Sequence, residues 1–385
     1  MNDTSITHLE YATTTPNVED KDSVDQDQKY TATLQGMGLN GIENAAPIES
    51  IFVLRDKHDN EEAYMPKGKV GLIAGYGGTG KSLLALELAL LVAHPLRAGR
   101  PKGKYGQALV TQPTTKKVAI FFGEEDQAGC AWRLRQAFQS LGVLDSYQTF
   151  KHNLLIVPLG GVPFSTAFVN KAETDSAKEW FNALKSRVED FGGDDGLDLI
   201  IVDPLSHFGG GEFEQDNGQA VELMRKLTEL TSIKGNPTVL GIHHSAKKSK
   251  DGRLDEMLRG SSALKDNSRW VAVLTRLGED KTGRRSLRWE SNGISREIVE
   301  LEIAKSNYTK RGQPLRFAIG PDGMTEITES IYLRLNAAAM KDDDIQENGQ
   351  INPEGDYIKS LNKEIQEEER KQRGHVFGAA PKRGY

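Results

Sequence analysis

Gly75-Tyr-Gly-Gly-Thr-Gly-Lys-Ser82 is the stretch of sequence that decides the fold of this chain. It satisfies the pattern G-x-x-x-x-G-K-[ST]. The apolar run Val70–Ala74 precedes it and the periodic apolar stretch Lys81–Ala93 follows it, so we expect a strand, a glycine-rich turn and a helix. Backbone N–H groups of such a turn surround phosphate oxygens, and the helix N-terminus adds partial positive charge. The residues expected to hold phosphates are Gly75, Gly77, Gly78, Thr79, Gly80, Lys81 and Ser82.

This loop predicts ATP and Mg²⁺ as ligands. Lys81 is expected to reach the β- and γ-phosphates, and the Ser82 hydroxyl to ligate Mg²⁺. Such a site needs a carboxylate at the end of a neighbouring strand to support the metal. Asp203 ends the apolar run 199–202 and provides it. The alternatives are a chance glycine-rich turn and an aspartate that merely starts a turn before Pro204.

Two further apolar runs end in polar side chains. The run 118–122 leads to Glu124, Glu125 and Asp126, where a water-orienting acid is expected, although spacing does not decide which acid acts. The run 239–242 leads to His243 and His244, which point to opposite faces if they continue the strand. We expect one of them to sense the γ-phosphate. Plain solvation of the acids and a structural role for the histidines are the alternatives.

The order of apolar runs and periodic stretches favours an α/β fold with a mostly parallel central sheet, followed by a strand-rich part after residue 270. The expected strands are 70–74, 118–122, 154–159, 197–202, 238–242, 270–275 and 301–304. The expected helices are 81–93, 128–141, 175–191 and 219–233. Polar composition predicts a disordered acidic tail over 1–46 and a polar, flexible tail over 336–385, partly helical at 359–373, around one domain of residues 47–335.

Composition limits the classes of protein that remain. The single cysteine, Cys130, rules out an intramolecular disulfide framework and a cysteine-built zinc site. The sequence shows neither a signal peptide nor an apolar run of about 18 residues, which favours a cytoplasmic protein without a membrane partner. The net charge is −6, and eight acids and two bases in residues 1–47 account for all of it. Residues 241–290 instead carry twelve Lys and Arg against seven Asp and Glu, which is a local patch for a polyanion or a solvated face.

Taken together, these residues resemble RecA-like hexameric helicases, and most closely the RepA family of plasmid replicative helicases. The resemblance covers about residues 66–325. The strings that carry it are Gly75–Ser82, Phe122–Asp126, Ile201–Ser206, His243–Lys247, Arg259–Trp270 and Lys305–Tyr308. The long basic stretch 95–117 and both tails depart from the family core. The resemblance implies a RecA-like P-loop NTPase core with a β-rich C-terminal part.

The family's roles then apply residue by residue. Glu125, the acid before the aspartate, matches the catalytic glutamate, and His244 matches the phosphate sensor. Arg269 resembles the arginine finger that reaches a neighbouring subunit's nucleotide, with Arg259 as its rival. Lys305 looks like the lysine that approaches the same phosphates.

The resemblance also implies a loop that contacts single-stranded DNA. The loop 245–259 is similar to a central-channel loop, and its bases would contact phosphates without reading sequence. These bases are Lys247, Lys248, Lys250 and Arg253. The glycine-rich segment 207–218 is a second candidate loop, although it contains three acids.

The function implied is an ATP-dependent DNA helicase, a homohexameric ring that translocates on single-stranded DNA in plasmid, phage or mobile-element replication. A replication initiator or loader protein is a further partner expected for such a ring. Two alternatives remain open: a DNA-dependent ATPase of recombination or repair, and a nucleotide-switched regulator or scaffold.

Overall fold

The computed structural model of the chain divides into two units, Met1–Pro47 and Ile48–Tyr385. All helices and strands below belong to the second unit. The residues described are 46–55, 61–94, 109–111, 117–162, 167–169, 175–210, 213, 215–245, 262–278, 287–291, 293–309, 312–327 and 330–337. The two tails expected from composition lie almost entirely outside these ranges, and the domain boundaries remain predictions.

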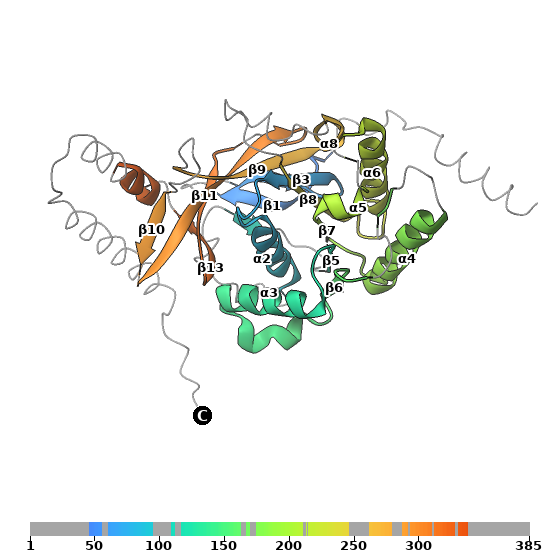
Figure 1. Ribbon diagram of the computed structural model, residues 1–385, viewed down its shortest axis with the longest axis horizontal. Helices are drawn as coiled ribbons and strands as arrows, with labels where there is room; N and C mark the ends of the chain where they lie inside the picture. Colours follow the sequence, from blue (N-terminus) through green and yellow to red (C-terminus); the bar gives the residue numbers. More distant parts are fainter. Residues whose placement is uncertain are drawn as a thin grey trace, which may run out of the picture. The chain divides into compact units, whose positions relative to one another are not determined.

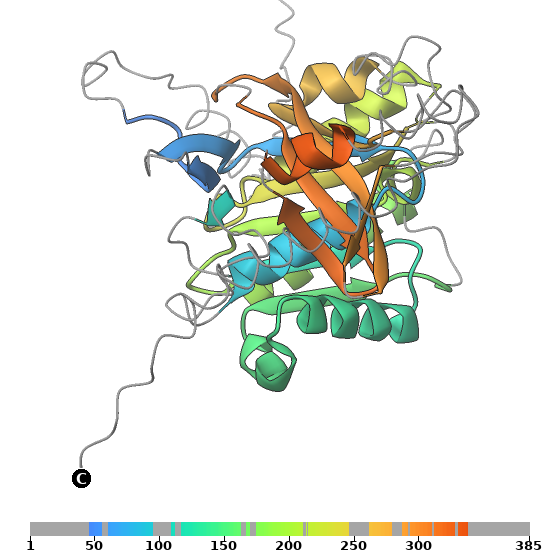
Figure 2. The ribbon, with the colours of Figure 1, turned by 90° about the vertical axis from the view of Figure 1, so that its left-hand side faces the viewer.

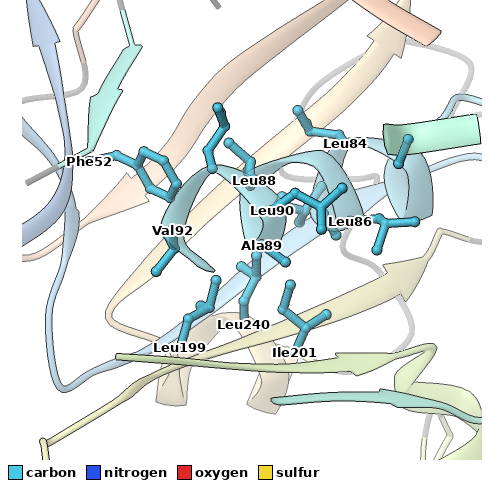
Figure 3. Close-up of a cluster of buried hydrophobic side chains, with 14 of the residues drawn as sticks. Phe52, Leu84, Leu86, Leu88, Ala89, Leu90, Val92, Leu199, Ile201 and Leu240 are labelled. Atoms are coloured by element: carbon cyan, nitrogen blue, oxygen red, sulfur yellow. The ribbon is translucent and has the colours of Figure 1, made fainter. Parts of the chain in front are cut away.

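The phosphate-loop unit folds as expected, with β3 (Val70–Gly75) leading through the loop into α2 (Lys81–Ala93). Every residue of β3 is buried, and α2 is buried from Leu84 to its end. Figure 3 shows why an almost wholly apolar helix is stable here, since its leucines pack on Leu199, Ile201 and Leu240 of the neighbouring strands. Burying each such side chain contributes roughly 1.5–3 kcal/mol relative to exposure.

Among the described residues, ten strands form the main sheet in the order β13-β12-β11-β9-β3-β8-β7-β5-β6, with β10 beside β11. The strands from β9 to β6 in this order run parallel, and β10 to β13 pair antiparallel. The remaining bounds are β5 (Val118–Phe122), β6 (Leu154–Pro158), β7 (Leu199–Asp203), β8 (Thr238–His244), β9 (Trp270–Arg276), β10 (Arg288–Ser291), β11 (Ile294–Ser306), β12 (Leu315–Gly320) and β13 (Gly323–Ile327). The expected α/β class, with a RecA-like parallel sheet and a β-rich C-terminal part, is confirmed.

Helices cover both faces of this sheet. Ile73 of β3 packs in one apolar cluster with α2 and α3, whereas its neighbour Leu72 packs in the other with α4 and α6, because successive strand residues point to opposite faces. In Figure 1, α2 and α3 lie below the strands, and α6 and α8 lie above them. The helices other than α2 are α3 (Gln127–Ser140), η3 (Leu144–Phe150), α4 (Asp175–Gly192), α5 (Leu205–Phe208), α6 (Asn217–Leu230) and α8 (Ser262–Asn267), with further helical residues at 330–337.

Two features were not expected from the sequence. A second sheet, β2-β1-β4, forms from β1 (Ser50–Arg55), β2 (Glu61–Pro66) and β4 (Leu109–Thr111), and its Tyr64 packs edge-on against Trp270 with ring centroids 5.5 Å apart. Strand β11 is 13 residues long, although only 301–304 were expected. Its first half alternates apolar and charged residues and therefore lacks a continuous apolar run.

The β12–β13 hairpin packs against the phosphate-loop helix, as Figure 2 shows from the side. The fully buried Glu87 of α2 accepts hydrogen bonds from Ser140 Oγ (2.6 Å) and from the Met324 backbone N–H (3.3 Å). This carboxylate therefore ties α2 to α3 and β13. Within the described residues, no helix is both long and apolar enough to span a membrane.

Candidate functional site

The loop between β3 and α2 has the backbone of a phosphate cradle. Gly78 and Gly80 have φ angles of 73° and 86°, which residues with a Cβ rarely adopt, so the pattern requires glycine there. Gly75 ends β3, Gly77 and Gly78 are exposed, and Thr79 is buried, with its Oγ1 donating to the Tyr76 carbonyl at 2.9 Å. Lys81 turns back over the loop and donates from Nζ to the same carbonyl at 2.7 Å.

Lys81, Ser82 and Asp203 meet at the carboxyl ends of β3 and β7. Burial lowers the pKa of Lys81 to about 8, opposed by the charges of Asp203 and Glu124. Burial raises the pKa of Asp203 to about 6, opposed by a hydrogen bond from Ser82 and by the charges of Arg133 and Lys81. A buried ammonium beside a hydroxyl and a buried carboxylate is a donor set that fits a phosphate and a divalent cation.

The three acids after β5 do different things. Asp126 begins α3 by accepting a hydrogen bond from the Gly129 N–H at 2.7 Å. Glu125 is bound by Arg133, which donates from Nε at 2.7 Å and from Nη2 at 2.5 Å. Glu124 is exposed, and its charge acts on Lys81, Asp203, His207 and His244. The structure thus brings Glu124, rather than Glu125, among the charged groups of the loop.

The two histidines at the end of β8 lie in different surroundings. His244 pairs with Gly75 in the sheet, is half-buried, and has its pKa lowered by burial and by Lys81. His243 is 2% exposed, and its ring lies edge-on to Phe213, with centroids 6.2 Å apart. His244 therefore lies beside the phosphate loop, whereas His243 belongs to the apolar layer behind it.

We expect His243 to make the protein sensitive to acid. Burial, then the charges of His244 and Lys81, lower its pKa to about 4, whereas an unfolded histidine titrates near 6.5. The unfolded chain therefore takes up a proton first as pH falls from about 6.5 to about 4, and His243 lowers the free energy of unfolding by up to about 3 kcal/mol over that window.

Denaturant titrations between pH 4.5 and 7.5 measure this effect. His243→Gln should lose most of the pH dependence, while His152→Gln, at an exposed histidine, should keep the wild-type slope. Equal slopes in the wild type and the His243 variant would contradict the assignment.

Arg269 and Lys305 lie at the opposite edge of the sheet. The Arg269 N–H donates to the carbonyl of Val70, the first residue of β3, at 2.9 Å, whereas the phosphate loop follows the last residue of β3. Six strand residues span roughly 17 Å, so neither side chain reaches the loop of its own chain. Lys305 donates from Nζ to the carbonyls of Lys265 (2.8 Å) and Asp266 (2.9 Å) at the end of α8. Burial and the charges of Arg269 and Lys265 lower the pKa of Lys305, opposed by Asp266.

The basic loop residues predicted to contact DNA lie outside the described residues, as does Arg259. They are Lys247, Lys248, Lys250 and Arg253. Their role remains a prediction.

Three residues near the loop were missed from sequence: Arg133, His207 and Arg276. A Cβ on Gly123 would lie 2.5 Å from His207 Cγ, which places the imidazole over the end of β5. Arg276, the last residue of β9, donates from Nη2 to the Gly78 carbonyl at 2.6 Å. No motif marks any of the three. The signal available was their position just after or at the end of strands that end beside the loop.

Known proteins share features with this chain. A family described as an AAA domain matches residues 53–250. The KaiC-like protein PH0186 from Pyrococcus horikoshii OT3 is 18% identical with a TM-score of 0.41, and the match covers 68% of this chain and 91% of that chain. A second solved structure, an ATPase domain, is 14% identical with a TM-score of 0.47, and the match covers 80% of this chain and 98% of that chain.

Proposed function

Because the chain belongs to the AAA-domain family, we propose that it hydrolyses ATP as a DNA helicase of the RepA type. The observation that carries this proposal is the division of the charged groups between the two edges of the sheet. Lys81, Asp203 and Glu124 lie at one edge, and Arg269 and Lys305 lie at the other. An ATP site with both sets of residues needs two copies of the chain.

In this mechanism Lys81 binds the β- and γ-phosphates, and the loop N–H groups orient them. Ser82 and Asp203 would hold Mg²⁺, which when bound neutralises phosphate charge as a Lewis acid. Asp203 must be ionised for this role. The Lys81 ammonium and the Ser82 hydroxyl both favour its ionised form against the effect of burial.

Glu124 is our candidate for the acid that orients and deprotonates the attacking water, in place of the Glu125 that the family resemblance implies. The charge of Glu124 acts on Lys81, Asp203 and both neighbouring histidines, whereas Arg133 binds the Glu125 carboxylate. His244, next to Gly75, is the candidate sensor of the γ-phosphate.

The pair Glu124→Gln and Glu125→Gln tests this choice. Because general-base catalysis is worth roughly 10²–10⁴-fold, Glu124→Gln should lower the steady-state rate of ATP hydrolysis by about that factor. Glu125→Gln keeps a hydrogen-bond acceptor for Arg133 and should change the rate by less than about tenfold. The opposite ranking of the two rates would return the role to Glu125.

Arg269 and Lys305 would act on the nucleotide held by the next copy, with Arg269 stabilising charge in the transition state. Six copies in a closed ring complete every site, and the loop 245–259 of each copy would contact single-stranded DNA in the central channel. The setting we propose is plasmid, phage or mobile-element replication, with an initiator or loader protein that places the ring on DNA.

The experiment that tests this function is the steady-state ATPase rate with and without single-stranded DNA at one stated salt concentration. A DNA motor predicts a several-fold stimulation that weakens as salt is added, because the loop contacts phosphates. A slow rate that DNA does not change would contradict the helicase and favour a nucleotide-switched regulator. Stimulation together with cooperative coverage of the strand, without a fixed number of subunits, would favour a recombination filament.

A further inference from the structure

Arg276 links the middle of the phosphate loop to the β-rich part of the sheet. It is the last residue of β9, the strand beside β3, and its Nη2 donates to the Gly78 carbonyl at 2.6 Å. Gly78 itself is exposed, and a Cβ on the preceding Gly77 would have no neighbour within 4 Å. This part of the loop therefore has little packing of its own, and Arg276 holds it by a hydrogen bond.

The guanidinium is held in place from the other side by β11. Arg276 Nε lies 3.0 Å from Glu297 Oε2. Arg276 pairs with Val299 in the sheet, so Glu297, two residues along β11, points to the same face and lies diagonally opposite. Arg288 of β10 pairs directly with Glu297, with Nη2 3.6 Å from Oε1. Three strands thus carry a line of alternating charge that ends on the loop.

Holding the Gly78 carbonyl also sets the direction of the next N–H. The peptide unit is planar and trans, so the Gly78 C=O and the Thr79 N–H point in opposite directions. The carbonyl points to Arg276, and the Thr79 N–H points back into the loop, toward the Tyr76 carbonyl at 3.4 Å. An N–H that points into the loop is the donor that a bound phosphate requires.

We propose that Arg276 is a positioning residue that keeps the Gly78–Thr79 peptide turned for phosphate binding and that Glu297 keeps Arg276 in place. This inference rests on the proposed binding of ATP. Ordering a glycine-rich loop costs conformational entropy, and a loop ordered in advance binds its ligand more tightly. Arg276 acts on the loop and not on the reacting phosphate, so ATP and ADP gain equally.

The test compares Arg276→Ala, Arg276→Lys and Glu297→Gln with the control Arg316→Ala. Arg316 is matched because it is also borne on a strand of this sheet and pairs with a cross-strand acid, Glu300, at 2.7 Å. The dissociation constants of MgATP and MgADP are measured by titration with a fluorescent nucleotide and competition, and the turnover number at saturating ATP is measured alongside.

Arg276→Ala should raise both dissociation constants by about tenfold, since a hydrogen bond from a charged donor is lost. Its turnover number should stay within about twofold of the wild type, because the chemical step is not touched. Arg276→Lys should recover part of the affinity, and Glu297→Gln should raise both constants by about threefold. Arg316→Ala should leave them unchanged.

Wild-type dissociation constants in Arg276→Ala would overturn the inference. So would weaker binding of ATP alone together with a lost turnover number, because Arg276 would then contact the γ-phosphate. Either result in a protein whose wild type turns over ATP leaves the proposed function standing. A wild-type protein that binds no nucleotide would overturn both.

Discussion

Replacing Lys81 by alanine should lower ATP turnover at least about 100-fold, because the variant loses the cation that faces the transferred phosphate. Lys81 is 2% exposed and supplies a positive charge to the buried carboxylate of Asp203. Without it, the pKa of Asp203 should rise further above its ordinary range and Mg²⁺ should bind more weakly. Phosphate release at saturating MgATP measures the effect.

Lys67→Ala is the matched control for this variant. Lys67 also pairs with a buried aspartate, with Nζ 3.6 Å from Asp198 Oδ1, but it precedes β3 instead of following it. Both variants should lower the thermal unfolding midpoint, because each leaves a buried carboxylate with less compensation. Only Lys81→Ala should abolish turnover. Equal turnover in the two variants would contradict the role of Lys81.

Replacing Arg269 by alanine should lower turnover by about 10³-fold while the dissociation constant of ATP changes by less than about twofold. The reason is position. Arg269 is exposed at the edge of the sheet opposite the phosphate loop, so it acts only on the nucleotide of a neighbouring copy. A transition-state contact of this kind changes the rate without changing ground-state binding.

Two variants separate the specific contact from the general positive potential at this edge. Arg269→Lys keeps the charge but loses the planar, bidentate guanidinium, so turnover should stay low. Lys265→Ala removes a neighbouring charge but keeps the backbone carbonyl that binds Lys305, so turnover should stay near the wild type. Wild-type turnover in Arg269→Ala would remove the finger assignment.

The elements around the phosphate loop could be predicted from the sequence because their signals are strong and local. The expected and observed bounds of α2 and β5 coincide. In both, buried residues are nearly continuous, so periodicity and turn residues agree. Strands β1, β2 and β4 could not be predicted, because they are short and β1 pairs with β4 far along the chain, Leu54 opposite Leu109. The first half of β11 failed for another reason, since its charged residues alternate with buried ones.

The partners of individual side chains were harder to predict than the elements. Glu124 and Glu125 are adjacent and chemically equal, and only the path of the chain into α3 decides that Arg133 binds Glu125. Arg276 has no motif around it. Its role depends on the register of β9 and β11, which brings Glu297 beside it, and sequence spacing does not contain that register.

The central claim is that an ATP site is shared between two copies, and mixing two inactive variants tests it most directly. Lys81→Ala and Arg269→Ala chains are dissociated, mixed in equal amounts and reassembled, and the ATPase rate is measured against each variant alone. About one interface in four then pairs an intact Lys81 with an intact Arg269, so turnover should recover to about a quarter of the wild type. The doubly substituted chain mixed with Arg269→Ala should stay inactive. A mixture no more active than its separate components would contradict the account.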